Sequence, residues 1–119
     1  MDKLFVQGGR RLNGTIPISG MKNAALPILF ACALNRETCI IHNVPTVSDI
    51  TNTLEILSAM GCAITYPSPN TVEINAAGFL VGSSPDHLVE KIRASSYLMG
   101  VELGREGRTR IAYPGGCKF

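Results

Sequence analysis

The stretch from Ala24 to Leu34 constrains the fold of this chain more than any other segment, because it is apolar on nearly every face of a helix. Asn23 precedes it as a candidate N-cap. Pro27 falls in or near the first turn, where backbone N–H groups lack helical partners. A helix with this pattern has to be buried all round, and it is too short to cross a bilayer. We therefore expect a core helix.

Two further helices are predicted downstream. The second lies between Thr46 or Ser48, its alternative N-caps, and Gly61, its C-cap. Apolar residues recur along it at helical spacing and form one buried stripe, namely Ile50, Leu54, Leu57 and Met60. The third is predicted as one continuous helix over residues 84–104, because it opens with serine as cap and proline at the first helical position and ends at glycine.

Short runs rich in β-branched residues predict strands between these helices. A turn-rich loop over residues 67–70 makes two of them a hairpin, so the sheet cannot be wholly parallel. From Thr38 onward the order is strand, helix, strand, strand, helix, strand, which indicates an α/β unit with helices on a small sheet. The predicted strands are Leu4–Val6, Thr15–Ile18, Thr38–His42, Ala63–Tyr66, Thr71–Ile74 and Thr109–Tyr113.

Composition and charge exclude several broad classes. The 119 residues suffice for one domain or for a piece of a larger one, and the net charge of +2 argues against a dedicated nucleic-acid binder. No apolar run reaches bilayer length, and the first residues lack the pattern of a signal peptide. We therefore expect a cytoplasmic protein without membrane attachment. Basic residues near the C-terminal end favour either an anionic small molecule or an ordinary solvated surface: Arg105, Arg108, Arg110 and Lys118.

Three of the four cysteines are predicted to be small core side chains, because apolar residues surround Cys32, Cys39 and Cys62. None of the four forms a CxxC pair, which disfavours a zinc site. Free thiols without a disulfide framework fit a reducing cytoplasm. The chain also lacks GxGxxG after a strand, a P-loop and HExxH, so a nucleotide-dependent motor or a zinc hydrolase is disfavoured.

The fourth cysteine, Cys117, lies on a glycine-flanked turn, Pro114 to Cys117. A thiolate attacks electrophiles, and Lys118 and the nearby arginines favour the thiolate form. The alternative is an incidental cysteine in a frayed tail. His42 and His87 are distant in sequence, and neither is an obvious base for a Cys-His pair.

Two further positions are candidates for binding an anion. Lys22 and Asn23 stand at the N-terminus of the predicted core helix, where phosphate and carboxylate groups bind; the alternative is a surface lysine beside a capping asparagine. Arg93 lies at the edge of the buried face of the third helix and could stack on a base or hold a phosphate. An arginine there more commonly extends its head group into water. Local sequence alone favours the structural alternative at both positions.

Five blocks occur together in a specific order, over residues 6–8, 18–29, 43–45, 93–95 and 114–117. The most specific are the long block from Ile18 to Leu29 and the block Pro114-Gly115-Gly116-Cys117. With these blocks the chain resembles, over its whole length, the first part of the UDP-N-acetylglucosamine enolpyruvyl transferases (UDP-N-acetylglucosamine 1-carboxyvinyltransferases).

This resemblance implies a fold and a reaction. The family fold consists of two inside-out α/β barrels built from repeated βαβαββ units, and this chain would supply one unit and the start of the next. The family moves the enolpyruvyl group of phosphoenolpyruvate to the 3-hydroxyl of UDP-N-acetylglucosamine by addition and elimination, the first committed step of peptidoglycan synthesis. The resemblance implies no metal or organic cofactor and no nucleic-acid partner.

The resemblance also assigns roles to individual residues. Lys22 and Asn23 would bind phosphoenolpyruvate, whose anionic groups need a cation and hydrogen-bond donors. Arg93 would contact UDP-N-acetylglucosamine, and Tyr97, where many relatives have tryptophan, could still stack on it. Cys117 would donate a proton and form a covalent adduct, and it corresponds to the cysteine that fosfomycin alkylates.

The resemblance reaches only the first part of the family length. Residues 1–20 would be a strand pair belonging to the other domain, and residues 21–119 would be the first unit and the start of the second, ending in the cysteine loop. We therefore expect a piece that is not active alone, acts at most as a binding fragment, and is marginally stable or self-associating without the rest of the transferase. A relative acting on shikimate 3-phosphate is the alternative, which the Gly-Gly-Cys loop argues against.

Overall fold

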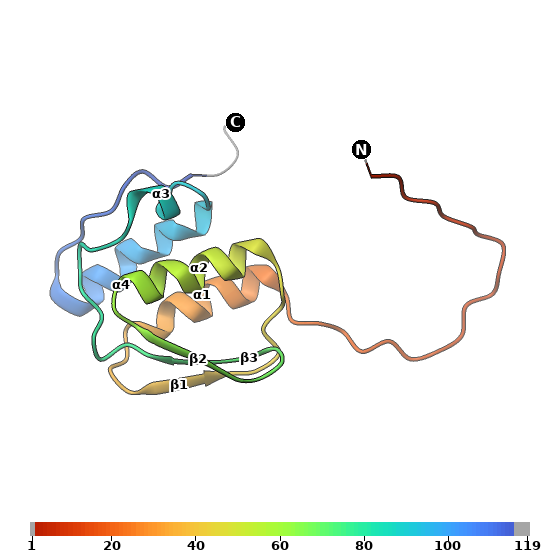
Figure 1. The fold of residues 1–119 in the computed structure, drawn as a ribbon, viewed down its shortest axis with the longest axis horizontal. Helices are drawn as coiled ribbons and strands as arrows, with labels where there is room; N and C mark the ends of the chain where they lie inside the picture. The colour runs from red at the N-terminus through yellow and green to blue at the C-terminus, as the bar shows by residue number, and fades with distance from the viewer. Residues whose placement is uncertain (1, 116–119) are drawn as a thin grey trace.

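The computed structural model describes residues 2–115 and arranges them as a sheet with helices on one side of it (Figure 1). This arrangement confirms the predicted α/β class. In chain order the elements are α1 (Lys22–Cys32), β1 (Thr38–Ile41), α2 (Ser48–Ala59), β2 (Ala63–Ser68), β3 (Thr71–Asn75), α3 (Asp86–Val89), the 3₁₀ helix η1 (Arg93–Ser96) and α4 (Tyr97–Glu106).

The sheet has three strands in the order β1-β3-β2, and both neighbours run antiparallel to β3. Residue Ile74 of β3 is paired with Cys39 on one side and Ile64 on the other. Because side chains alternate between the two faces of a strand, these three residues share one face. That face carries the helices, and the predicted hairpin between β2 and β3 is confirmed.

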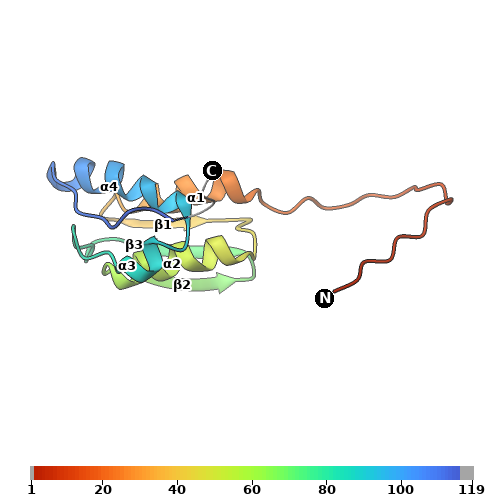
Figure 2. The ribbon, with the colours of Figure 1, turned by 90° about the horizontal axis from the view of Figure 1, so that it is seen from above.

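The hydrophobic core lies between the sheet and the helices. Helix α1 packs against α2 and α4, and α2 packs against α3 (Figure 2). The side chains that are completely or almost completely buried come from nearly every element, and the largest apolar ones are Leu29, Phe30, Ile56, Leu57, Met60, Ile74, Val89 and Leu98.

Helix α1 begins earlier than the sequence predicts. It starts at Lys22 with Met21 as its N-cap, so Asn23 lies inside the first turn and does not cap the helix. Pro27 lies in the second turn and, having no N–H, cannot bond the carbonyl four residues earlier. The predicted burial on every side is also wrong, because Ile28 is 47% exposed. Helices α2 and α4 pack against α1, and within residues 2–115 nothing fully covers the side that carries Ile28.

The predicted start of α2 is wrong, whereas its predicted end is correct. Val47 is the N-cap and makes no side-chain hydrogen bond, so neither Thr46 nor Ser48 has the predicted capping role. At the other end, Gly61 adopts φ 98°. The amide of Gly61 bonds Ser58 O and the amide of Cys62 bonds Leu57 O, as in a Schellman motif.

The predicted continuous helix over residues 84–104 is wrong, because the chain forms α3, η1 and α4 instead. Ile92 adopts an extended conformation (φ −133°, ψ 138°) and interrupts the helical path. Ser95 is buried at this break, and its hydroxyl lies 2.8 Å from Val89 O and 2.7 Å from Ile92 O. The single hydrogen of this hydroxyl can satisfy one of these two carbonyls at a time, and a continuous helix would have used both.

Arg105, in the last turn of α4, has a structural role in this fold. Its guanidinium donates to Ala33 O at 3.2 Å and to Ala76 O at 3.1 Å, and it lies 5.5 Å from the centroid of the Phe79 ring. It therefore joins α4 to the ends of α1 and β3. Arg108, in contrast, pairs at the surface with Glu106 at 2.9 Å.

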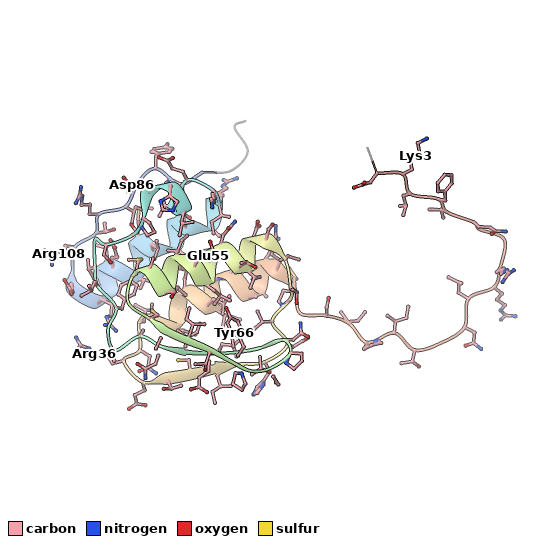
Figure 3. All side chains as sticks on the ribbon, viewed as in Figure 1. Lys3, Arg36, Glu55, Tyr66, Asp86 and Arg108 are labelled. Carbon is pink, nitrogen blue, oxygen red and sulfur yellow. The ribbon has the colours of Figure 1, made fainter. Side chains whose placement is uncertain are left out.

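Two predicted strand regions are not strands in this structure. Residues 2–19, which we call the arm, contain no strand and extend away from the rest of the chain (Figures 1 and 2). Figure 3 shows Lys3 on this arm, far from the helices. Residues 109–113 run along the helices without strand pairing. A strand needs a hydrogen-bonded neighbour, and neither region has one within residues 2–115.

Candidate functional site

A cavity of about 300 Å³ lies where the first turn of α1 meets the start of α2 and the junction of η1 with α4. We call it the α1 cavity. It brings together four residues that the sequence analysis singled out from distant parts of the chain: Lys22, Asn23, Arg93 and Tyr97. The rest of its lining comprises Leu26, Asp49, Ala94 and Ser96.

The first turn of α1 contributes hydrogen-bond donors and positive potential to this cavity. The N–H groups of Lys22 and Asn23 come before the first possible helical bonds and point outward from the helix end. The aligned peptide dipoles add partial positive charge at the same place. Together with the Lys22 ammonium group, this turn can hold a phosphate or a carboxylate.

Asp49 also lines the cavity, and the sequence analysis did not single it out. Its Oδ2 lies 2.7 Å from Lys22 Nζ, and it belongs to the first turn of α2. The ion pair spans two helices and directs the lysine along the cavity wall. A local signal existed, because an acidic residue in the first turn of a helix is favourable, but nothing local indicates that its partner would be Lys22.

Arg93 and Tyr97 bring the junction of η1 and α4 into the lining of the cavity. Arg93 opens η1 and lines both this cavity and a second one described below. Tyr97 begins α4 and is 48% exposed, while its ring centroid lies 6.2 Å from that of Phe30 at an interplanar angle of 41°. Tyr97 is therefore held by the core on one part of its ring and remains half exposed beside the cavity.

A second cavity of about 650 Å³ adjoins the first, and we call it the adjoining hollow. Arg93 and Ser96 line both cavities. Residues 109–115, which we call the terminal segment, contribute their last five residues to the lining of the adjoining hollow. Gly115 N donates to Val89 O at 3.4 Å, and a Cβ on Gly115 would overlap the Glu90 carbonyl. The predicted catalytic residue Cys117 lies outside the described residues.

The buried cysteines do not contribute a nucleophile. Burial raises the pKa of the Cys32 thiol to about 12 and that of the Cys62 thiol to about 11. Both thiols are therefore protonated near neutral pH and slow to react. The prediction of core side chains is confirmed for Cys32 and Cys62, whereas Cys39 is only partly buried against the core. Within residues 2–115 no group of His, Cys, Asp and Glu side chains could hold a metal ion, and no helix could span a membrane.

These two raised pKa values predict a loss of stability in alkali. Unfolded cysteines release their protons near the ordinary pKa of 9.0, whereas the folded thiols retain theirs. The folded state therefore binds more protons above this pH, and the free energy of unfolding must fall as pH rises. We expect urea midpoints to decline from pH 8 toward pH 10, with a smaller decline in a Cys32→Ala, Cys62→Ala variant. Parallel declines in the two proteins would contradict this assignment.

Comparison with known proteins identifies the family. A family model described as EPSP synthase (3-phosphoshikimate 1-carboxyvinyltransferase) matches residues 6–119. The chain belongs to this enolpyruvyl transferase family. The resemblance predicted from the sequence blocks is confirmed by relatives named UDP-N-acetylglucosamine 1-carboxyvinyltransferase. Those from Solidesulfovibrio magneticus and Hydrogenovibrio crunogenus are 47% and 40% identical over 117 residues.

These matches cover 98% of this chain but 28% of each relative, so the chain spans about a quarter of their length. Among solved structures, the enolpyruvyl transferase NikO from Streptomyces tendae aligns with a TM-score of 0.71 and 29% identity, over 84% of this chain and 23% of that chain. The enolpyruvyl transferase fold predicted for this chain is therefore confirmed.

Proposed function

We propose that this chain is the part of a cytoplasmic UDP-N-acetylglucosamine enolpyruvyl transferase that holds the anionic groups of the substrates. The supporting observation is the α1 cavity, where Lys22, Asn23, Arg93 and Tyr97 meet although the first and last are far apart in sequence. Relatives named UDP-N-acetylglucosamine 1-carboxyvinyltransferase support UDP-N-acetylglucosamine as one substrate, and the family resemblance implies phosphoenolpyruvate as the other. In this role the family would serve peptidoglycan synthesis.

Each side chain has a role that its chemistry allows. Lys22 and the first N–H groups of α1 bind the phosphate and carboxylate of phosphoenolpyruvate by charge-assisted hydrogen bonds. Asn23 adds an amide donor at the same place. Arg93 binds the diphosphate of the sugar nucleotide, because its planar guanidinium suits phosphate oxygens. Tyr97 stacks on a planar group of that substrate.

The proposed reaction has two steps. The sugar 3-hydroxyl oxygen bonds to C2 of phosphoenolpyruvate while a proton is delivered to C3 and the hydroxyl proton departs to a base. In the second step C3 loses a proton and the C2–O bond to phosphate breaks, which restores the double bond and releases inorganic phosphate. Cys117 is the proposed donor of the proton to C3, and the base belongs to the remainder of the transferase.

Intact mass measurement with fosfomycin tests this function directly. We expect one adduct that maps to Cys117, forms faster with UDP-N-acetylglucosamine and is lost in Cys117→Ala. We also expect no phosphate release from the two substrates by this chain alone. A chain that gains no adduct, although iodoacetamide still alkylates Cys117, would show that the site is not assembled here.

Substrate choice is tested separately, by comparing the binding of UDP-N-acetylglucosamine with that of shikimate 3-phosphate. We expect the sugar nucleotide to bind more tightly, and Arg93→Ala to weaken its binding. Preference for shikimate 3-phosphate would favour the alternative enolpyruvyl transferase.

A further inference from the structure

Glu102 is a completely buried carboxylate in the middle of α4. Its Oε1 accepts a hydrogen bond from the amide of Gly82 at 2.8 Å. Its Oε2 accepts from the Thr109 hydroxyl at 2.7 Å and from the amide of Arg110 at 2.8 Å. Glutamate is almost never fully buried without partners, and three donors from two loops here satisfy both oxygens.

These bonds attach a part of the chain that has little other support. The terminal segment, residues 109–115, contains neither helix nor strand. At its start it is held by Glu102, and at its end by the bond from Gly115 N to Val89 O at 3.4 Å. Between these points Ile111 and Ala112 pack against the core. The path of an irregular segment depends on such attachments, because it has no ladder of its own.

The terminal segment also forms one wall of the adjoining hollow, and Arg93 and Ser96 form part of the other wall. A shift of the segment at Thr109 and Arg110 would therefore change the space beside the α1 cavity. The segment leads directly to Cys117 in the sequence. The position of residues 109–115 therefore sets the point from which the chain continues toward Cys117.

We propose that Glu102 is a positioning residue that holds the terminal segment at the correct place and angle for the reaction of Cys117. The effect of Glu102 on catalysis rests on the proposed function, whereas the attachment of residues 109–115 to Glu102 does not. Glu102 lines neither the α1 cavity nor the adjoining hollow, so its proposed effect on the reaction runs through residues 109–115.

Two substitutions separate the contributions of shape and hydrogen bonding. Glu102→Leu keeps much of the buried volume and removes every acceptor, leaving two amides and one hydroxyl without partners. Glu102→Gln keeps one carbonyl oxygen, so either the Gly82 or the Arg110 amide must face an NH₂ group instead of an acceptor. Glu106→Gln is a matched control on the same helix, since Glu106 only pairs with Arg108 at the surface.

Amide hydrogen exchange by NMR tests the attachment in this chain. Glu102→Leu should accelerate exchange about tenfold or more at Gly82 and Arg110, which lose their acceptor. The decisive amide is that of Gly115, because its acceptor, Val89 O, is not removed by the substitution. If Glu102 holds the segment, the Gly115 amide should also exchange faster, while the amides of α1, α2 and β3 stay protected. Glu102→Gln should be intermediate, and Glu106→Gln should match the original chain. Unchanged protection at Gly115 would overturn the proposal.

A second measurement tests the link to reactivity. In Glu102→Leu we expect fosfomycin to modify Cys117 at least about tenfold more slowly, the effect of losing buried hydrogen bonds. Iodoacetamide, which needs no assembled site, should still modify it, and continued protection of Cys32 and Cys62 would show that the fold is intact. Equal fosfomycin rates in the two proteins would refute positioning. If the original chain forms no adduct, the proposed function fails, and exchange at Gly115 alone decides whether Glu102 holds the segment.

Discussion

Gly61→Ala should lower the free energy of unfolding by about 3 kcal/mol or more, a large effect for a single methyl group. Gly61 has φ 98°, where a side chain is strained, and its Cβ would overlap the carbonyl of Gly78. That carbonyl is backbone, so it cannot move without displacing the residues that lead into Phe79 of the core. Urea denaturation followed by circular dichroism would measure the loss.

Gly107→Ala provides the matched control for this prediction. Gly107 also has positive φ, at 67°, but a Cβ there would have open space around it. Its substitution should therefore cost only the conformational penalty of about 1–2 kcal/mol. The difference between the two variants isolates the collision with Gly78. Equal losses in both variants would show that the close approach of the two chain segments is unimportant.

Lys22→Ala should have the largest effect on ligand binding. We expect the affinity for phosphoenolpyruvate to fall about tenfold to 100-fold, because a charge-assisted hydrogen bond contributes about 1.5–3 kcal/mol. Isothermal titration calorimetry on the original chain and the variant would measure it. Lys22→Arg should retain part of the affinity, since it keeps the positive charge near the first turn of α1.

Lys91→Ala controls for the loss of a positive charge. Lys91 is exposed and lies outside the lining of the α1 cavity, so we expect its substitution to leave binding nearly unchanged. Asp49→Asn removes the partner of Lys22 and should change affinity without abolishing binding. If Lys22→Ala bound phosphoenolpyruvate as tightly as the original chain, the anion site would have to be placed elsewhere.

Local sequence patterns correctly predicted those helices and strands that depend only on residues a few positions apart. The apolar stripe of α2 and the left-handed Gly61 that follows it both occur as predicted. The hairpin of β2 and β3 also occurs where the turn residues place it. Each of these features depends on residues close in sequence, so local propensity and periodicity suffice to predict it.

The wrong predictions were strands that lack a pairing neighbour and a helix that was predicted to be continuous. The β-branched residues near Ile16 and near Ile111 have strand propensity, but no neighbouring strand pairs with them within residues 2–115. The continuous third helix is interrupted at the extended Ile92, where the one hydrogen of the buried Ser95 hydroxyl can bond the carbonyl of either Val89 or Ile92. The packing that buries Ser95 overrides local helix propensity here.

For the candidate site, too, sequence and tertiary structure determined different things. The sequence by itself, through the resemblance of its blocks, determined the family and selected Lys22, Asn23, Arg93 and Tyr97 as site residues. Only the tertiary structure decided that they share one cavity. It alone also revealed the carboxylates of Asp49 and Glu102, whose partners lie 27, 20, 7 and 8 residues away. A carboxylate carries the same charge at any position, and its role depends on which donors the folded chain brings to it.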